Sequence, residues 1–151
     1  MVLYAAYGPN LHPARMAERA PLSPLVDTGW LTDWRLTFAG EDIGLGGSLA
    51  TVVEEAGSAV FVAIYELHPL DERRLDDWEG LDLGNWRKLR ARVNLLTTDT
   101  IAWMYVLDAY EGGLPSAHYL GMLADSAEAG GAPGDYVTQI RQHPCTGIGP
   151  R

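Results

Sequence analysis

A glutamate near the middle of the chain has the surroundings expected of an acid/base group. Glu79 stands in the segment LDDWEG, Leu75 to Gly80, at the end of a predicted helix. A carboxylate in the last turn of a helix meets the negative end of the helix dipole, and partial shielding by Trp78 acts in the same direction, so both should raise its pKa. Such a group can transfer protons near neutral pH. The competing interpretation is a solvated carboxylate, because Glu79 aligns with Glu72 and Asp76 on an acidic helix face.

A second candidate segment is YGPNL, which follows the first predicted strand. It consists of Tyr7, Gly8, Pro9, Asn10 and Leu11. A glycine turn that leads into a helix N-terminus presents backbone N–H groups outward, which suits a carboxylate or a developing oxyanion. Taken alone, the segment is better explained as an ordinary strand-to-helix turn.

Metal and thiol chemistry have weak support in the sequence. The four histidines show no HxH or HxxxH spacing, so we expect surface or packing roles for His12, His68, His118 and His143. Cys145 lies beside His143, which superficially pairs a thiol with a base. Nucleophilic cysteines normally sit on rigid, electropositive elements, whereas this one is close to a terminus. No metal and no other cofactor is therefore predicted.

The patterning predicts an α+β fold in which short turns join several strands. The last two strands form a hairpin through the turn at 97–100, which argues against a purely parallel sheet and favours a mixed, strongly curved sheet or small barrel with helices at its margins. Four glycines between residues 40 and 47 predict a flexible connection that could act as a lid. Strands are predicted at 1–6, 34–38, 49–54, 59–67, 86–96 and 101–107, and helices from 10 or 12 to 19 and at 69–79, 116–129 and 133–142.

The clearest helix is the one at 69–79, which would carry Glu79. Pro69 suits its first turn, and Asp71 and Glu72 favour its N-terminal dipole. An apolar stripe is expected to face the core, and Gly80 should end the helix as a left-handed cap. The stripe consists of Leu70, Leu75 and Trp78.

Length and composition indicate one domain over residues 1–151, with a flexible tail from about residue 145. The chain has 151 residues, 47% of them hydrophobic, and a single cysteine, so no internal disulfide can form. A reducing cytoplasm is the expected compartment. The N-terminus has the pattern of a strand and not of a signal peptide, and no apolar run has the length of a membrane span.

Charge argues against a nucleic-acid partner. The formal net charge is −9, and the basic residues are dispersed except for a group at 87–92. There Lys88, Arg90 and Arg92 alternate with apolar residues, which predicts the solvated face of a strand.

Taken together, the segments resemble the gamma-glutamylcyclotransferase family. YGPNL is similar to the family's YGSNL signature, and LDDWEG matches its LDxxEG signature, whose glutamate carries the chemistry. Trp86 stands seven positions after that glutamate, where relatives often have an aromatic residue. The stretch at 110–119, which ends at Tyr119, resembles the family's tyrosine-rich loop, and the stretch at 131–136 resembles a following helix start. These segments occur in the family's order along nearly the whole chain.

The resemblance implies a small mixed β-barrel, closed or nearly closed, with flanking helices, and a cyclisation reaction. Glu79 would take a proton from the α-amine of a gamma-glutamyl substrate, the amine would attack its own side-chain carbonyl, and 5-oxoproline would form. The turn at residues 7–11 would hold the substrate together with Trp86 and Tyr119. Neither metal nor nucleotide is required, since nucleophile and carbonyl share one molecule. The resemblance is also consistent with a homodimer.

Two alternatives stay open at this point. One is an enzyme of the same fold that acts on glutathione or on a biosynthetic gamma-glutamyl amine, and the other is a non-catalytic domain that binds small acidic ligands. Pro9 stands where serine is usual in the family, so it lacks a hydroxyl and a backbone N–H. If the family contacts its substrate through the N–H groups of neighbouring residues, Pro9 should change substrate binding little. If the family contacts its substrate through the serine itself, Pro9 should alter substrate preference. Glu79 favours an enzyme over a binding domain, because a carboxylate without a catalytic role would only repel acidic ligands.

Overall fold

The structure is a computed structural model that describes residues 2–40, 48–79, 86–107 and 112–146. Five strands and five helical segments make up the described chain, in agreement with the predicted α+β class. In chain order they are β1 (Val2–Ala6), the 3-10 helix η1 (Pro9–Leu11), α1 (Pro13–Arg19), β2 (Leu25–Ala39), β3 (Leu49–Leu67), α2 (Pro69–Glu79), β4 (Trp86–Asn94), β5 (Asp99–Leu107), α3 (Ala117–Ala129) and α4 (Gly134–Arg141).

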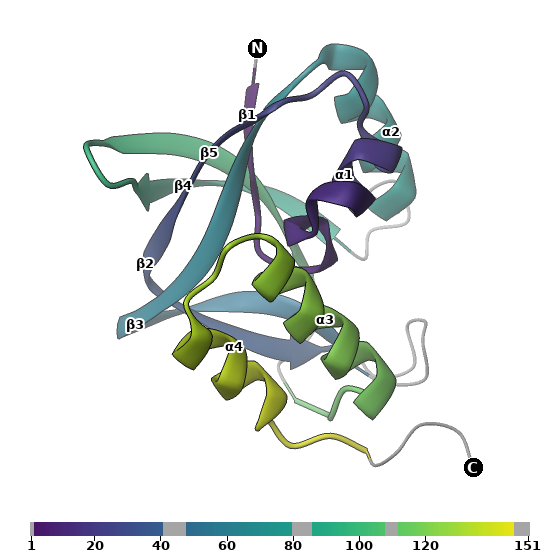
Figure 1. The fold of residues 1–151 in the computed structure, drawn as a ribbon, viewed down its shortest axis with the longest axis vertical. Coiled ribbons are helices and arrows are strands. Elements are labelled where there is room, and N and C mark those ends of the chain that lie inside the picture. Colours follow the sequence, from purple (N-terminus) through teal and green to yellow (C-terminus); the bar gives the residue numbers. More distant parts are fainter. Residues whose placement is uncertain (1, 41–47, 80–85, 108–111, 147–151) are drawn as a thin grey trace.

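The strands close into the predicted small mixed barrel, and their order around it is β1-β3-β2-β4-β5 (Figure 1). Neighbouring strands pair antiparallel except β1 and β5, which run parallel where Tyr4 lies opposite Trp103. β4 and β5 form the predicted hairpin, from Trp86 opposite Leu107 to Asn94 opposite Asp99. Because β1 and β5 are parallel, their carboxyl ends lie at the same end of the barrel, where the segment after β1 begins.

The prediction of three short strands between residues 34 and 67 is wrong, because the structure contains two long ones. β2 has 15 residues and β3 has 19, and they pair with each other along nearly their whole length. The register shifts between Thr32 and Trp34, where Asp33 adopts a positive φ of 68° and its carboxylate accepts the amide of Gly57. The polar and glycine residues that suggested loops therefore form an irregularity that bends a continuous strand pair.

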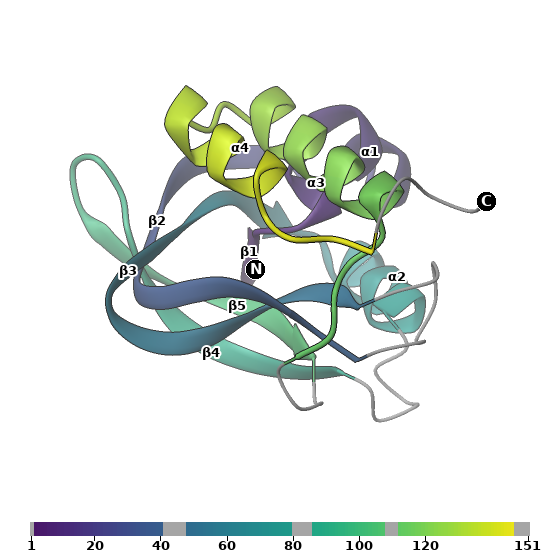
Figure 2. The same ribbon diagram turned by 90° about the horizontal axis from the view of Figure 1, so that it is seen from below.

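The helices follow the predictions closely. α1, α3 and α4 cover one side of the barrel, with β4 on the opposite side, and α2 lies near one end (Figure 2). His12 accepts the amide of Ala14 at the start of α1, and Ser116 caps α3 by accepting the amide of Tyr119. Both predicted helix starts are explained by these caps.

The core fills the barrel and the space beneath α3 and α4. Trp30, Phe61 and Tyr136 meet edge to face or tilted, with ring centroids 5.4 to 6.1 Å apart, and so attach α4 to the long strands. The chain still contacts this body near its end, since the Thr146 amide donates to the carbonyl of Pro115. The rest of the predicted flexible tail lies outside the described residues, as do residues 41–47 of the predicted lid.

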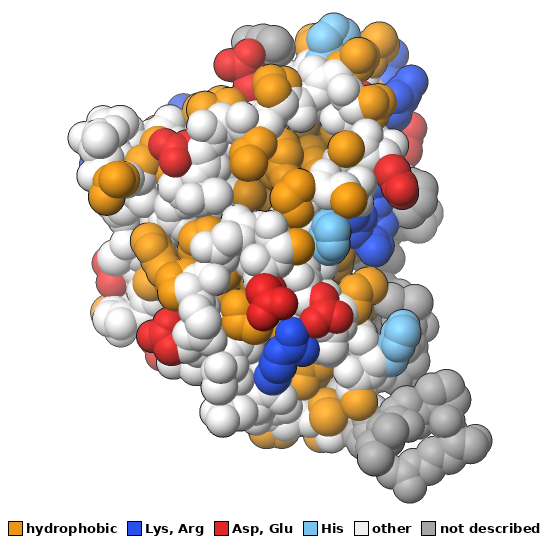
Figure 3. Space-filling model, viewed as in Figure 1, with side chains coloured by type: hydrophobic (Ala, Val, Ile, Leu, Met, Phe, Trp, Pro, Cys, Tyr) orange, Lys and Arg blue, Asp and Glu red, His pale blue; other side chains and the backbone are white. Residues whose placement is uncertain are grey.

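On the face shown in Figure 3, the described Lys and Arg side chains are scattered among acidic and apolar ones. No helix in the described ranges is both long and apolar enough to span a membrane.

Candidate active site

The predicted helix that carries Glu79 has the predicted bounds, Pro69–Glu79, so Glu79 is its last residue. The side chains of Trp78 and Glu79, and the predicted cap Gly80, lie outside the described part of the chain. The roles predicted for them therefore stay predictions, and what the structure describes is how the rest of α2 is held.

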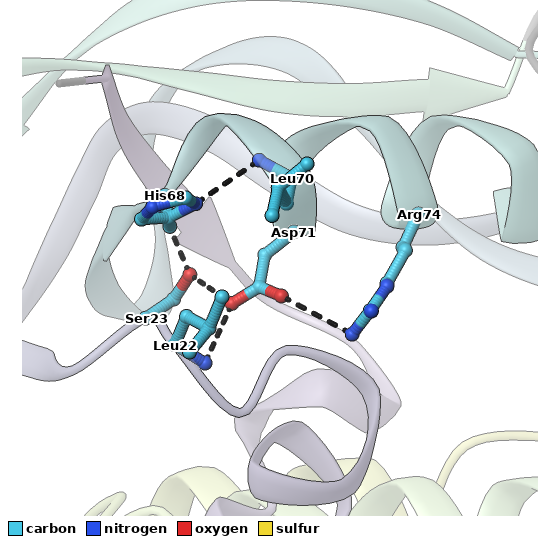
Figure 4. A network of polar contacts seen from close by, with 6 residues as sticks. All are labelled: Leu22, Ser23, His68, Leu70, Asp71 and Arg74. Atoms are coloured by element: carbon cyan, nitrogen blue, oxygen red, sulfur yellow. Dashed lines mark hydrogen bonds and ion pairs between the residues drawn. The ribbon is translucent and has the colours of Figure 1, made fainter.

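The predicted apolar stripe of α2 is only partly correct. Leu75 is fully buried, whereas Leu70 is 51% exposed. Asp71 anchors the first turn instead. The sequence predicted only that its charge favours the helix dipole, whereas the structure also buries its side chain completely. One oxygen of its carboxylate accepts the Leu22 amide at 2.8 Å and the Ser23 hydroxyl at 2.7 Å (Figure 4). Ser23 in turn accepts the backbone N–H of His68, so the loop before β2 and the start of α2 share one network.

The two described carboxylates of the acidic face of α2 are paired with a lysine and are not simply solvated. Glu72 and Asp76 are both partly buried, and both accept hydrogen bonds from Lys88 of β4, at 2.9 and 3.0 Å. Asp76 also accepts the hydroxyl of Tyr105 at 2.6 Å. The prediction of a solvated basic face on β4 is likewise wrong for Lys88, whose side chain is only 20% exposed. Burial alone lowers the pKa of Lys88, but its hydrogen bonds to Asp76 and Glu72 outweigh burial and hold the pKa above its ordinary value.

The YGPNL segment follows β1 directly and forms the 3-10 turn η1. Leu11 donates its amide to the carbonyl of Gly8 at 2.9 Å and buries its side chain completely, so its N–H is used within the turn. Asn10 is also buried: it donates to the Tyr4 hydroxyl and accepts from Arg19. Pro9 is the first residue of the turn, a position that tolerates the missing N–H.

Gly8 is the residue of this turn that packing does not explain. Its φ is −109° and its ψ is −141°, and a Cβ built there would meet no other atom of the described residues within 4 Å. Neighbouring described side chains therefore do not require glycine here. Close approach of a ligand to the backbone would favour glycine, because a side chain would occupy that space.

Tyr105 of β5 joins the two signature segments. Its carbonyl accepts the hydroxyl of the buried Tyr7, and its own hydroxyl donates to Asp76, one helical turn before Glu79. The residue after β1 and the last turn of α2 thus bond to the same residue, one to its main chain and the other to its side chain. The sequence pattern does not single out Tyr105, because alternation along β5 indicates burial and not which distant groups meet.

The two other predicted residues lie near the same end of β5. Trp86 is partly buried and pairs with Leu107, whose amide donates to the hydroxyl of Thr51. Tyr119 is buried on α3 and accepts the amide of Ala50, the neighbour of Thr51. Since Tyr105 and Leu107 are two residues apart on one strand, they share a face.

No group of three or more His, Cys, Asp or Glu residues is placed to hold a metal ion within the described ranges. His12 and His68 accept amides at helix starts, and His143 packs against Phe38 with ring centroids 4.6 Å apart. Cys145 is partly buried against the core.

A groove of about 730 Å³ runs between α1 and α2, beside the candidate site. It is lined by Arg15, Glu18, Arg19, Arg74, Leu75 and Asp77. Arg19 also reaches Asn10 of the YGPNL turn, so the groove borders that turn on the side of α1.

Comparison with known proteins places the chain in a family. Residues 59–140, more than half of the chain, match the AIG2-like family, and the protein belongs to it. It is 25% identical to human gamma-glutamylcyclotransferase over 144 residues, which cover 92% of this chain and 77% of that protein. It is 27% identical to the bovine gamma-glutamylcyclotransferase over 143 residues, or 91% and 76% of the two chains.

Solved structures agree on the fold. A structure of a gamma-glutamyl cyclotransferase matches with a TM-score of 0.88 at 23% identity, covering 99% of this chain and 93% of that one. A crystal structure of an uncharacterized human protein matches with a TM-score of 0.89 at 22% identity, covering 99% and 92%.

Proposed function

We propose that this protein is a gamma-glutamylcyclotransferase that converts the gamma-glutamyl group of a small substrate to 5-oxoproline and releases an amino acid or amine. The observation that supports this most directly is the meeting of the two signature segments at Tyr105, beside a glycine turn with open space at Gly8. The relatives that cover most of the chain carry the same activity in their names.

The proposed reaction needs one acid/base group and an orienting surface. Glu79 accepts a proton from the substrate's α-ammonium or α-amine, whose nitrogen then attacks the γ-carbonyl carbon. The tetrahedral intermediate collapses as the original amide C–N bond breaks, and Glu79 returns a proton to the departing nitrogen. The two products together contain all the atoms of the substrate, so water is not consumed.

The turn after β1 is the proposed binding surface. Open space at Gly8 lets a carboxylate or the developing oxyanion approach the backbone there, where main-chain N–H groups can stabilise negative charge. Asn10 and Leu11 support the turn from within, since both side chains are buried. Substitution of the family's serine by Pro9 is then compatible with binding, because Pro9 occupies the start of the 3-10 turn.

Trp86 and Tyr119 are proposed to complete the pocket on the side of β4 and α3. Trp86 pairs with Leu107 at the end of β5. The hydroxyl of Tyr119 accepts the amide of Ala50 in β3. The single cysteine favours a reducing cytoplasm as the compartment of this protein. The family resemblance favours a homodimer, and light scattering of the purified chain would measure its mass in solution.

The decisive experiment incubates the purified protein with a panel of gamma-glutamyl dipeptides, gamma-glutamyl amines and glutathione. We expect 5-oxoproline and the free amine or amino acid in equal amounts, with rates unchanged by EDTA. Free glutamate in place of 5-oxoproline would identify a hydrolase. Binding of 5-oxoproline without turnover of any panel member would identify the binding domain instead and contradict the proposal.

A further inference from the structure

The chain contains one lysine, and it contacts the helix proposed to carry the acid/base group. Lys88 lies on β4, and its ammonium reaches Glu72 at 2.9 Å and Asp76 at 2.8 Å from two successive turns of α2. The ammonium also lies 5.7 Å from the centre of the Tyr105 ring, in the range of a cation–π contact. One side chain therefore joins β4, β5 and α2.

Asp76 is the residue on which these contacts converge. Its carboxylate accepts from the Lys88 ammonium and, at 2.6 Å, from the Tyr105 hydroxyl. The three side chains are partly or fully buried, so these charged hydrogen bonds are screened less than exposed ones. Two donors from two different strands fix both the position and the rotation of this carboxylate.

Asp76 precedes Glu79 by three residues, which is about one turn, or roughly 4.5 Å along the helix axis. A contact that fixes Asp76 therefore fixes the last turn of α2. The same Tyr105 accepts the Tyr7 hydroxyl through its main-chain carbonyl, so the helix end and the YGPNL turn are held to one residue. Asp77, the next residue on the helix, is exposed and borders the groove toward α1 instead.

We propose that Lys88, Asp76 and Tyr105 form a positioning brace, which sets where the last turn of α2 lies relative to the Tyr7–Leu11 turn. The inference rests on the proposed function, because it assigns the brace the task of placing Glu79 against the substrate amine. Lys88 and Tyr105 act through Asp76 and do not contact the reacting atoms.

A brace of this kind has a kinetic signature that a purely structural contact lacks. In the proposed function, the turn at residues 7–11 binds the substrate. This turn is bonded to β5 through the main-chain carbonyl of Tyr105, so the bond remains when the side chain of Tyr105 is substituted. Loss of the brace should therefore lower kcat and leave KM nearly unchanged. A displacement of about 1 Å at a reacting group can lower a rate by up to about 100-fold.

The test compares Lys88→Met, Lys88→Arg and Tyr105→Phe with wild type in the 5-oxoproline assay, together with melting temperatures. We expect Lys88→Met to lower kcat by about 10- to 100-fold with KM within about twofold. Lys88→Arg should restore most of the rate, because a guanidinium can also bridge two carboxylates. Tyr105→Phe removes only the hydroxyl and should give a smaller loss of kcat, which keeps the test valid if Lys88→Met does not fold.

The matched control is Arg92→Met on the same strand, which removes an exposed ion pair with Asp99 at 3.7 Å. It should leave kcat and KM unchanged. The brace is wrong if Lys88→Met and Tyr105→Phe keep the wild-type kcat, or if they raise KM alone. A wild type that forms no 5-oxoproline from any substrate overturns the proposed function and this inference together, whereas active wild type with unaffected variants overturns the brace alone.

Discussion

Asp71 is the one charged side chain buried in the described core, and its environment explains why it is tolerated there. It accepts a backbone amide from Leu22 and a hydroxyl from Ser23, and its position in the first turn of α2 places the negative charge at the favourable end of the helix dipole. Arg74 lies 3.7 Å from its second oxygen. The carboxylate therefore fastens the start of α2 to the loop before β2.

We expect Asp71→Ala to lower the free energy of unfolding by about 2 to 4 kcal/mol, because it leaves the Leu22 amide and Ser23 hydroxyl without their acceptor. Urea unfolding measures this change. Asp125→Ala is the control: it removes an exposed ion pair with Arg141 and should cost less than about 1 kcal/mol. Equal losses in the two variants would show that the Asp71 network contributes no more than a surface contact.

Glu79 is the residue on which the proposed chemistry depends. Glutamine keeps the shape of its side chain but cannot accept a proton, so Glu79→Gln should lower turnover by at least about 10²- to 10⁴-fold. The melting temperature should hold or rise slightly, because a charge opposing the helix dipole is removed. Turnover and 5-oxoproline binding separate the two effects.

The control for Glu79→Gln is Asp77→Asn. Asp77 is an exposed carboxylate on the same helix, whereas Glu72 and Asp76 are bound to Lys88 and cannot serve as neutral comparisons. Near-normal turnover in Glu79→Gln would remove the acid/base assignment.

At the scale of elements, the end of α3 packs directly on the YGPNL turn. A Cβ at Gly130 would lie 2.6 Å from the carbonyl oxygen of Leu11, which is closer than real side chains approach. Glycine at this helix end is therefore required by close packing, since its φ of −78° suits any residue. The same helix contains Gly121, where a Cβ would meet nothing within 4 Å.

These two glycines give a matched pair. Gly130→Ala should destabilise the fold by about 1 to 3 kcal/mol, because α3 must move away from the turn. Gly121→Ala should stabilise it by up to about 1 kcal/mol through helix propensity. Urea unfolding of both variants measures the difference, and a Gly130→Ala variant as stable as Gly121→Ala would contradict the close packing of α3 on η1.

At the scale of the whole molecule, three groups among the described residues link stability to alkaline pH. Burial raises the pKa of Tyr136 from 10.0 to about 12 and also raises the pKa of Tyr65. The folded protein keeps these protons at a pH where the unfolded chain has lost them, so stability is full below pH 10 and falls as pH rises further. Lys88 acts in the same direction, since its raised pKa stabilises the folded state only while the ammonium stays protonated.

We therefore expect the free energy of unfolding to fall steeply between about pH 10 and 12, with about 2 kcal/mol of the loss from Tyr136. Urea unfolding at several alkaline pH values measures the slope. Tyr136→Phe should flatten it, because phenylalanine does not ionise. A slope identical in the variant would show that Tyr136 titrates at its ordinary value in the folded protein.

The sequence by itself determined the local elements of this protein. The bounds of α2, the hairpin of β4 and β5, and the starts of α1 and α3 follow from proline, cap and turn residues that act on their immediate neighbours. The two signature segments were also visible, because each is a run of consecutive residues.

The tertiary structure decided which distant groups meet. Tyr7 bonds to a residue 98 positions away, and Leu22 to Asp71 across 49 positions. It also decided that β2 and β3 are continuous, that Asp71 is buried and that Lys88 is paired. Local periodicity indicates whether a side chain faces inward. The register and closure of the barrel determine which distant residue that side chain contacts. Those choices depend on packing across all five strands, which the sequence pattern of any one strand does not contain.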